Sequence, residues 1–483
     1  MHSKDKGKHK TCFISGKFNV VHPGHLRLFR HAKEIADELV VGVYADDYRL
    51  AGDILLAETE RREGVGANLW VDSVIPVQDI KETILKLKPD VVLKGKEHEG
   101  RANLETEVIE EYGGLLKFTG GGPWLSSSAL IQAEASSSEN IFLNADRFLE
   151  RHKISLDSLA DSIKMLANIR VTVVGDLILD RYVDCEPLGL SSEDPTVVVS
   201  PLATKTFVGG AGIVAAHAAR LGLQASLVSI RGDDDAGERA MNQLRQQDVD
   251  ARVLVDPDRP TTQKTRYRAS GKTLLRVNDV RDHQIDQNLS QNILENVNES
   301  LSESDLIIFS DFSYGLFSDD LVVEITRYGK ERGIVMAADS QSSSQMGDIT
   351  RFSGMTLLTP TEREARLAVR DNKSGLVGVS ERLRQVTEAQ YIPITLASEG
   401  VFLHRPEEEG FGWTDDQVPA LNVNPIDVAG AGDAFLVATS LSLSAGVDIW
   451  RSIYVGSIAS ACQINRIGNV PLSREELLER IYR

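Results

Sequence analysis

Short apolar runs alternate with amphipathic segments through the first 120 residues of the chain. The apolar runs have the length and β-branched content of strands, and they lie at residues 11–15, 39–46, 73–77, 90–95 and 115–120. The segments between them carry apolar residues at helical spacing, at residues 25–36, 80–87 and 104–112. Strands that alternate with helices in this way predict an α/β unit built on an open parallel sheet.

A second α/β unit begins at the strand-like segment 169–174 and continues to residue 483. Between the two units, serine clusters are followed by a stretch whose apolar residues recur at helical spacing: Ile154, Leu156, Leu159, Ile163 and Leu166. We therefore predict a first domain at 11–135, a linker with a helix at 136–168, and a second domain at 169–483.

Two segments of the second unit, 196–202 and 262–277, do not follow the strand and helix alternation. In the latter, alternating polar and apolar residues flank a turn that contains Gly271. This pattern predicts a β-hairpin, part of a small sheet that projects from the main body. Such a projection would suit a lid over a binding site.

Composition narrows the classes of function. The 53 Lys and Arg residues against 71 Asp and Glu residues give a formal net charge of −18, which disfavours general nucleic-acid binding. The three cysteines are scattered singly, so neither a disulfide framework nor a structural zinc site is indicated. All apolar runs are far shorter than the roughly 20 residues that cross a bilayer. We expect a cytoplasmic protein that binds neither nucleic acids nor membranes.

A first chemical motif, GKFNVVHPGH, follows the first strand and places His22 and His25 in a loop that runs into a helix. At a helix N-terminus, free amides and the helix dipole already favour anions. The site suits attack of one phosphate on the α-phosphorus of a nucleoside triphosphate, which depends on positioning and charge stabilisation. Two other interpretations stay open: a helix cap beside a surface histidine, or a zinc pair, although metal-binding histidines on one helix are more often four residues apart.

The glycine turn, the aromatic residue, HxGH and the serine-rich helix start resemble the nucleotidyltransferase family that includes the cytidylyltransferases, over residues 11–132. The resemblance implies a Rossmann-like domain in which both histidines contact the triphosphate. It implies further nucleotide-binding positions at Gly16, Phe18, Arg61, Lys94, Ser126, Ser127 and Ser128. The serines could instead be simple helix caps, and the two basic residues solvated charges. The chain departs from the family at Asn19, where aspartate is usual, and at residues 51–56, which lack its basic residues.

A second motif, NPIDVAGAGDAF, places Gly430, Ala431 and Gly432 directly before Asp433 and an apolar helix. Small residues let the backbone approach a ligand closely, so the amides of this turn can form an anion hole. Asp433 could then take a proton from a sugar hydroxyl while the amides stabilise a transferring phosphoryl group. Taken alone, the motif is equally compatible with a structural, glycine-rich helix start.

Two more motifs, VVGDLILDRY at 173–182 and VGGAGIVAAHAARLG at 208–222, accompany it. Together with the hairpin they resemble the ribokinase-like carbohydrate kinases over residues 168–483. The resemblance implies Asp433 as the catalytic base and residues 430–432 as the anion hole. It also implies an indirect magnesium contact at Glu364 and sugar or sugar-phosphate contacts at Asp180, Gly209, Gly210, Arg266 and Arg276. Arg266 and Arg276 could instead be exposed strand charges.

The kinase-like half departs from its family at four positions. Ile213 and Thr361 stand where asparagines are common, and Tyr314 and Gln341 stand where heptose kinases have lysine. These differences predict either an altered substrate or a weakened kinase.

A chain that carries both halves resembles the bifunctional heptose-7-phosphate kinases and heptose-1-phosphate adenylyltransferases, with the domain order reversed. The resemblance implies phosphorylation of a sugar phosphate at O1 and nucleotidyl transfer to a sugar 1-phosphate, with ATP and Mg²⁺ and with a homodimer formed through the lid. Two alternatives stay open: an active transferase fused to a kinase-like sugar-binding or dimerisation module, and a regulatory protein in which both sites have degenerated.

Overall fold

The computed structural model describes residues 9–19, 21, 23–46, 48, 54, 56–95, 105–119, 139–166, 168–192, 194, 196–269, 272–341, 347–405, 415–422 and 424–482. The chain divides into two compact units. The first comprises Met1–Phe148, Val369–Arg382 and Leu396–Pro419, and the second comprises Leu149–Ala368, Leu383–Thr395 and Ala420–Arg483. Within the described residues, no helix is long and apolar enough to cross a membrane.

The first unit contains a five-stranded sheet in the order β3-β2-β1-β4-β5, and every neighbouring pair is parallel. Its strands are β1 (His9–Gly16), β2 (Ala36–Tyr44), β3 (Ser73–Val77), β4 (Val91–Gly95) and β5 (Leu115–Thr119). The chain changes direction across the sheet between β1 and β4, so a ligand crevice is expected at their carboxyl ends.

The helices of this sheet unit are α1 (Pro23–Ile35), α2 (Glu58–Gly66), α3 (Ile80–Leu87) and α4 (Glu105–Tyr112). The predicted strands and three of these helices are confirmed. The sequence pattern missed α2, because only Arg61 and Val65 are buried there and the helix carries no apolar stripe.

Two helices lie in the stretch predicted as a linker, α6 (Glu139–Arg151) and α7 (Leu156–Lys164). The side chains of Ser155 and Ser158 form a capping box that starts α7. Leu159 and Ile163 are buried, and α7 packs against two helices of the second unit, α15 (Ile449–Gln463) and α16 (Arg474–Ile481). A helix is therefore present where one was predicted, and it packs within the second unit.

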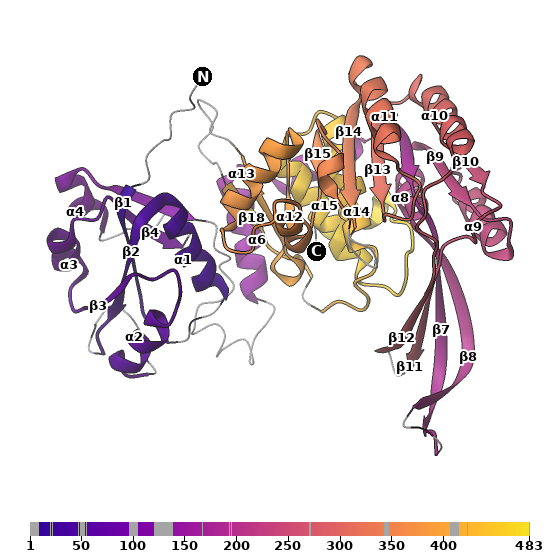
Figure 1. Cartoon of the computed structure of the whole chain (residues 1–483). Coiled ribbons are helices and arrows are strands. Elements are labelled where there is room, and N and C mark those ends of the chain that lie inside the picture. The colour runs from indigo at the N-terminus through magenta and orange to yellow at the C-terminus, as the bar shows by residue number, and fades with distance from the viewer. Residues whose placement is uncertain are drawn as a thin grey trace. The chain divides into compact units, whose positions relative to one another are not determined.

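The second unit is built on a six-stranded parallel sheet in the order β10-β9-β6-β13-β14-β15 (Figure 1). Its strands are β6 (Arg170–Gly175), β9 (Gln224–Arg231), β10 (Asp250–Val255), β13 (Leu306–Asp311), β14 (Val335–Ser340) and β15 (Leu357–Leu358). Every residue of β13 is buried, as expected for a parallel strand covered by helices on both faces.

The larger helices packed around this sheet are α8 (Ala211–Arg220), α9 (Asp235–Gln246), α10 (Gln287–Leu301), α11 (Asp319–Glu331) and α14 (Ala431–Ser444). The remaining short elements of the chain are η2 (Ile349–Arg351), α12 (Glu362–Ala368), α13 (Leu376–Thr387), β16 (Ile394–Thr395), η3 (Ala397–Glu399), β17 (Val401–His404) and β18 (Asp415–Val418).

Four strands project from the second unit as a separate sheet in the order β12-β11-β7-β8 (Figure 1). They are β7 (Leu177–Leu190), β8 (Val197–Gly210), β11 (Gln263–Ala269) and β12 (Lys272–Asp279). The predicted hairpin is confirmed as β11 and β12, although Gly271 of its turn lies outside the described residues. The exceptional segment 196–202 is part of β8, whose long antiparallel pairing with β7 was not predicted.

Candidate functional site

A cavity of about 310 Å³ opens in the second unit between the projecting sheet, the end of β14 and the start of α14. It brings together most of the kinase-type residues predicted from the sequence: Asp180, Gly210, Arg266, Arg276, Glu364, Gly430, Ala431, Gly432 and Asp433. These residues come from six elements of the chain, β7, β8, β11, β12, α12 and the start of α14. Parallel sheets of this kind bind ligands at the carboxyl ends of their strands.

The turn before α14 has a backbone that only glycine fits at Gly430. Its φ is 75°, and a Cβ there would lie 2.6 Å from Asn469 Oδ1. Asp427 stabilises the turn, because its carboxylate accepts hydrogen bonds from the backbone amides of Ala429 at 3.2 Å and Gly468 at 3.1 Å. A Cβ on Gly432 would meet nothing within 4 Å. Protein packing therefore leaves open space at Gly432, where a ligand can approach the backbone.

Asp433 lies in the first turn of α14 and is buried. Its Oδ1 accepts a hydrogen bond of 3.2 Å from Nε2 of Gln341, which follows β14. Burial, reinforced by the negative charge of Asp180, raises the pKa of Asp433 to about 7, although Lys264 and Gln341 act in the opposite direction. A carboxylate with a pKa near neutrality is suited to accept a proton from a hydroxyl group.

Asp180 faces the same cavity from β7. Its carboxylate accepts Arg266 Nη1 at 2.7 Å and Asn469 Nδ2 at 2.9 Å. Burial raises the pKa of Asp180, and the positive charges of Arg266 and Lys264 oppose that shift. A Cβ on Gly209 would lie 2.4 Å from Asp180 Oδ2, so glycine is required for this carboxylate to fit.

Gly210 supports the same corner of the cavity. It is the N-cap of α8 with a φ of 57°, and a Cβ there would lie 2.3 Å from the carbonyl oxygen of Asp176. Both glycines of the predicted sugar loop thus shape the site through close backbone approach.

The two predicted lid arginines have different surroundings. Arg266 and Arg276 are directly opposite each other on β11 and β12. Arg266 is committed to Asp180 and also donates to the Tyr182 hydroxyl at 3.1 Å. Arg276 is exposed, lines the cavity, and has no hydrogen-bond or ion-pair partner within the described part of the chain. Its guanidinium is therefore available to an anionic ligand.

The structure describes all four positions at which the chain departs from the kinase family, and one of them, Gln341, is the hydrogen-bond partner of Asp433. Ile213 is buried in α8, and Tyr314 is buried after β13. Thr361 lines the cavity and starts α12, because its hydroxyl and amide donate to Glu364 Oε2 at 2.8 and 2.9 Å. Across the described residues, no group of three or more His, Cys, Asp or Glu side chains could hold a metal ion.

Sequence reasoning assigned no role to three residues that this site uses. Asp427 lies in the predicted motif, but its contact with Gly468, like that of Asn469 with Asp180, joins distant segments, which no local pattern signals. Lys264 also lines the cavity. A signal for Lys264 existed, because residues two apart on a strand share a face and Arg266 had already been assigned to the site.

In the first unit, Gly16 ends β1 and His25 lies in the first turn of α1, as predicted. Phe18 is buried with a left-handed φ of 50°, and its ring centroid lies 4.8 Å from that of His25. A Cβ on Gly16 would approach the Phe18 ring to 3.0 Å. The turn thus packs the aromatic residue against one of the two predicted histidines. His22 lies outside the described residues, as do Ser126, Ser127 and Ser128.

The two basic residues predicted for the nucleotide have partners within the unit. Arg61 is fully buried and donates to Lys17 O, Leu56 O and Asp46 Oδ1, each at 2.7 Å. It therefore orders the loop after β1. Lys94, at the end of β4, donates to the buried Glu105 carboxylate at 2.7 Å.

Two protein-family models match the chain in separate ranges. Residues 13–118 match the cytidylyltransferase-like family, and residues 168–475 match the pfkB family of carbohydrate kinases. The kinase match alone covers more than half of the 483 residues.

Individual proteins resemble the chain in sequence and in fold. The chain is 30% identical over 323 residues to the bifunctional protein HldE of Helicobacter hepaticus, covering 65% of this chain and 64% of that protein. The chain thus spans less than two thirds of that curated relative. Its fold resembles phosphofructokinase-2 from Escherichia coli, with a TM-score of 0.54, 16% identity and coverage of 65% and 98%. Arabidopsis thaliana ribokinase, solved with ribose and ATP, gives a TM-score of 0.50, 18% identity and coverage of 65% and 99%.

Proposed function

Because the chain belongs to the pfkB family of carbohydrate kinases, we propose that it phosphorylates a sugar phosphate of the heptose 7-phosphate class at O1. We propose further that its first domain transfers a nucleotide from ATP to a sugar 1-phosphate and releases pyrophosphate. The observation that carries the kinase assignment is one cavity in which the buried Asp433 adjoins the open backbone at Gly432. The domain limits 11–135, 136–168 and 169–483 belong to the same proposal.

The geometry supports direct transfer of the phosphoryl group. Asp433 takes the proton of the sugar O1 hydroxyl as that oxygen forms a bond to the γ-phosphorus. The bond from phosphorus to the bridging oxygen breaks, and ADP leaves with the electron pair. The amides of the 430–432 turn lie where they can stabilise charge on the transferring group. Asp180, held by Arg266 and Asn469, is placed to bind a sugar hydroxyl.

The phosphate already present on the sugar has a candidate partner in Arg276. Its uncommitted guanidinium lines the cavity, whereas Arg266 is neutralised by Asp180. A planar guanidinium binds phosphate oxygens in pairs, which favours a sugar phosphate over a free sugar.

Magnesium is part of this proposal as an ion that the nucleotide phosphates carry, since the described side chains build no metal cage. Glu364 lines the cavity and would approach the ion indirectly. The ion would supply positive charge against the phosphate oxygens.

The transferase proposal relies on the N-terminus of α1 together with the carboxyl ends of β1 and β4. His25 lies in the first helical turn, where anions are favoured, and His22 completes the predicted pair. Gly16 and Phe18 shape the loop, and the serines at 126–128 are kept as predicted phosphate contacts. Arg61 and Lys94 are kept in the proposal as residues that border the nucleotide.

We also propose that the kinase lid is the interface of a cytoplasmic homodimer. The lid carries large apolar side chains in solvent, with Leu190 70% and Leu202 69% exposed. Leu190 is directly opposite Val197, which is likewise exposed. Grouped exposed apolar residues mark interaction surfaces, and a second copy of the chain offers a matching apolar sheet.

The direct test is to measure ADP release and pyrophosphate release separately, with ATP or CTP and a panel of sugar phosphates and sugar 1-phosphates. The proposal predicts ADP release that depends on a sugar phosphate, and pyrophosphate release from ATP that depends on a sugar 1-phosphate. Pyrophosphate release with no sugar-dependent ADP release would instead indicate a transferase joined to an inactive kinase-like module.

A further inference from the structure

Lys264 is a buried cation at the cavity, and no acidic group of the described residues forms an ion pair with it. It lies on β11, on the same strand face as Arg266, and is only 5% exposed. Its side chain lines the cavity, and within the described residues its ammonium group makes no hydrogen bond and no ion pair. A buried ammonium with three unused donors is costly unless an acceptor arrives, so its environment suits an anionic ligand.

Two aromatic rings hold this ammonium in place. Nζ of Lys264 lies 4.3 Å from the centroid of the Phe312 ring and 5.2 Å from that of the Tyr314 ring. Ring faces attract a cation but leave its N–H groups without acceptors. The side chain is therefore positioned in advance while its hydrogen-bonding capacity stays free.

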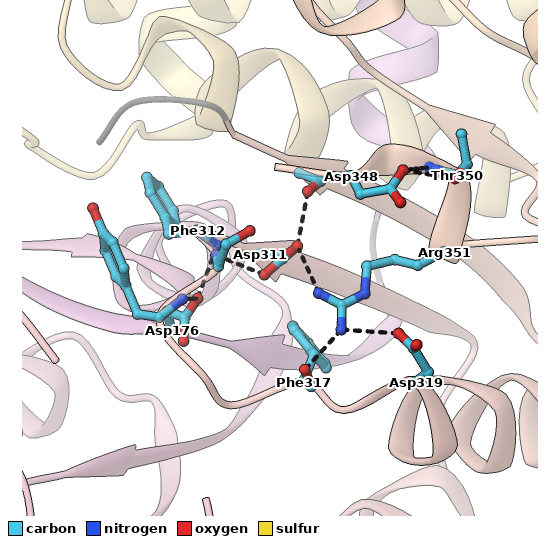
Figure 2. Close-up of polar contacts among 11 residues, drawn as sticks. Asp176, Asp311, Phe312, Phe317, Asp319, Asp348, Thr350 and Arg351 are labelled. Atoms are coloured by element: carbon cyan, nitrogen blue, oxygen red, sulfur yellow. Dashed lines mark hydrogen bonds and ion pairs between the residues drawn. The ribbon is translucent and has the colours of Figure 1, made fainter. Parts of the chain in front are cut away.

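The turn that carries the two rings is itself fixed by two buried aspartates (Figure 2). Asp176 accepts the amides of Phe312 at 2.8 Å and Tyr314 at 3.4 Å. Asp311 accepts the amide of Ser313 at 2.8 Å, and Ser313 has a left-handed φ of 59°. These bonds stabilise an unfavourable backbone conformation, as is common where a site must be rigid.

Asp311 is held in turn by its own partners. It accepts the hydroxyl of Ser340 at 2.8 Å and lies 3.7 Å from a guanidinium nitrogen of Arg351, which also donates to Phe317 O (Figure 2). The end of β13, the end of β14 and η2 are thus tied together beneath the rings. The position of Lys264 therefore depends on an ordered network and not on a mobile surface chain.

Lys264 lines the same cavity as Asp180 and Asp433 and acts electrostatically on both carboxylates. Its positive charge lowers the pKa of Asp433 and of Asp180, in each case against the larger effect of burial. Asp180 on β7 raises the pKa of Asp433. Asp339 on β14 is a further acidic neighbour, and burial together with the charges of Glu364 and Asp433 raises its own pKa. Arg266 is paired with Asp180. Lys264 is the cation of this inner group that no carboxylate pairs directly.

We infer that Lys264 is a catalytic residue of the kinase reaction, whose ammonium donates hydrogen bonds to the phosphoryl group during its transfer to the sugar. The inference rests on the proposed kinase function. Arg276 is exposed and suits the phosphate that the sugar already carries, whereas Lys264 is buried and lines the same cavity as the base. Lys264 keeps its proton throughout, and the proton of the sugar hydroxyl goes to Asp433. Fixed positive charge against developing phosphate charge accelerates the transfer.

The test compares Lys264→Met with wild-type protein in the sugar-dependent ADP assay. Methionine is unbranched and only one heavy atom shorter than lysine, and its thioether can pack against aromatic rings, but it carries no charge. We expect kcat to fall about 10²- to 10³-fold, with a smaller change in KM for the sugar phosphate. The acidic limb of the pH profile should move to higher pH, because Asp433 loses a neighbouring positive charge. Lys264→Arg should recover part of the rate.

Lys272→Met is the matched control, because Lys272 is an exposed lysine of the same sheet, on β12. It should leave kcat and the pH profile unchanged. Thermal unfolding of each variant reports whether the second unit is folded and should match that of the wild-type protein. Pyrophosphate release by the first domain should stay at the wild-type level, because both lysines lie in the second unit.

Three outcomes would overturn the inference. The first is a kcat for Lys264→Met within threefold of wild type. The second is a loss confined to KM for the sugar phosphate, which would show that Lys264 binds the resident phosphate and not the transferring one. The third is an unshifted pH profile beside a reduced kcat that Lys264→Arg fails to improve, which would indicate a structural role. If the wild-type protein releases no sugar-dependent ADP, the proposed kinase function itself fails, a distinguishable result.

Discussion

At the scale of single residues, a substitution at Gly432 can test ligand binding without disturbing the fold. Its Cβ would meet no protein atom within 4 Å, and its backbone is not left-handed. We predict that Gly432→Ala leaves thermal stability unchanged or slightly higher, because alanine favours a helical start. The methyl group would occupy the approach to the amides, so kcat/KM of the kinase should fall roughly 10-fold or more.

Gly64→Ala in α2 is the matched control, since a Cβ there also meets open space and the residue lies in the other unit. It should change neither kinase activity nor pyrophosphate release. Wild-type kinase kinetics in Gly432→Ala would mean that no ligand approaches this turn.

Asp433 predicts a pH dependence of stability whose sign follows from its raised pKa. Between the ordinary value of 3.8 and about 7, the folded protein binds the proton that the unfolded chain has lost. The contribution of Asp433 to the free energy of unfolding therefore falls as pH rises through that window. Above about pH 7 the buried carboxylate is ionised and the full destabilisation is present. Asp433→Asn has no carboxylate to ionise and should therefore be more stable than the wild-type protein at pH 8, by at most about 4 kcal/mol in the free energy of unfolding. The two free energies should become equal near pH 4.

Denaturant titrations of the two proteins across pH 4–8 measure this difference. Asp235→Asn is the control, because the Asp235 carboxylate is 96% exposed on α9 and should give a flat difference. The same pKa predicts that the kinase rate of the wild-type protein rises with pH through about 7. A stability difference independent of pH would contradict the assignment of Asp433 as the titrating carboxylate.

At the scale of elements, the sequence predicted the parallel strands, the hairpin and the helix that starts at the GAGD motif. It did not predict the division of residues 173–182 into β6 and β7. That division depends on a distant strand, because a Cβ on Gly175 would lie 2.0 Å from Ser310 O and the Asp176 amide donates to the same oxygen. Contacts between segments 135 residues apart leave no local pattern, and the same holds for the contact of Asn469 with Asp180.

At the same scale, the exposed apolar residues of the lid can be tested for their role in dimer formation. Replacing both Leu190 and Leu202 with threonine keeps strand propensity but removes the apolar surface. We expect the wild-type protein to sediment as a dimer and the double variant as a monomer with unchanged secondary structure. Lys205→Thr, an exposed position on the same strand β8 as Leu202, should remain a dimer. A monomeric wild-type protein, or a double variant that stays dimeric, would contradict the proposed interface.

At the scale of the whole molecule, the two proposed reactions belong to separate ranges of one chain. The kinase residues all lie in the second unit, around one cavity. The HxGH residues lie in the first unit, which matches a different family model. Because the two proposed sites share no residue, we expect that each reaction can be removed without the other.

The most direct measurement is a crossed comparison of Asp433→Asn and His25→Ala, with ADP and pyrophosphate release followed in each. Asp433→Asn should lower sugar phosphorylation by about 10²- to 10⁴-fold and leave nucleotidyl transfer near the wild-type rate. His25→Ala should lower nucleotidyl transfer by on the order of 10²-fold, mainly in kcat, and leave sugar phosphorylation intact. A kinase rate within twofold of wild type in Asp433→Asn, or loss of both reactions in either folded variant, would contradict the account.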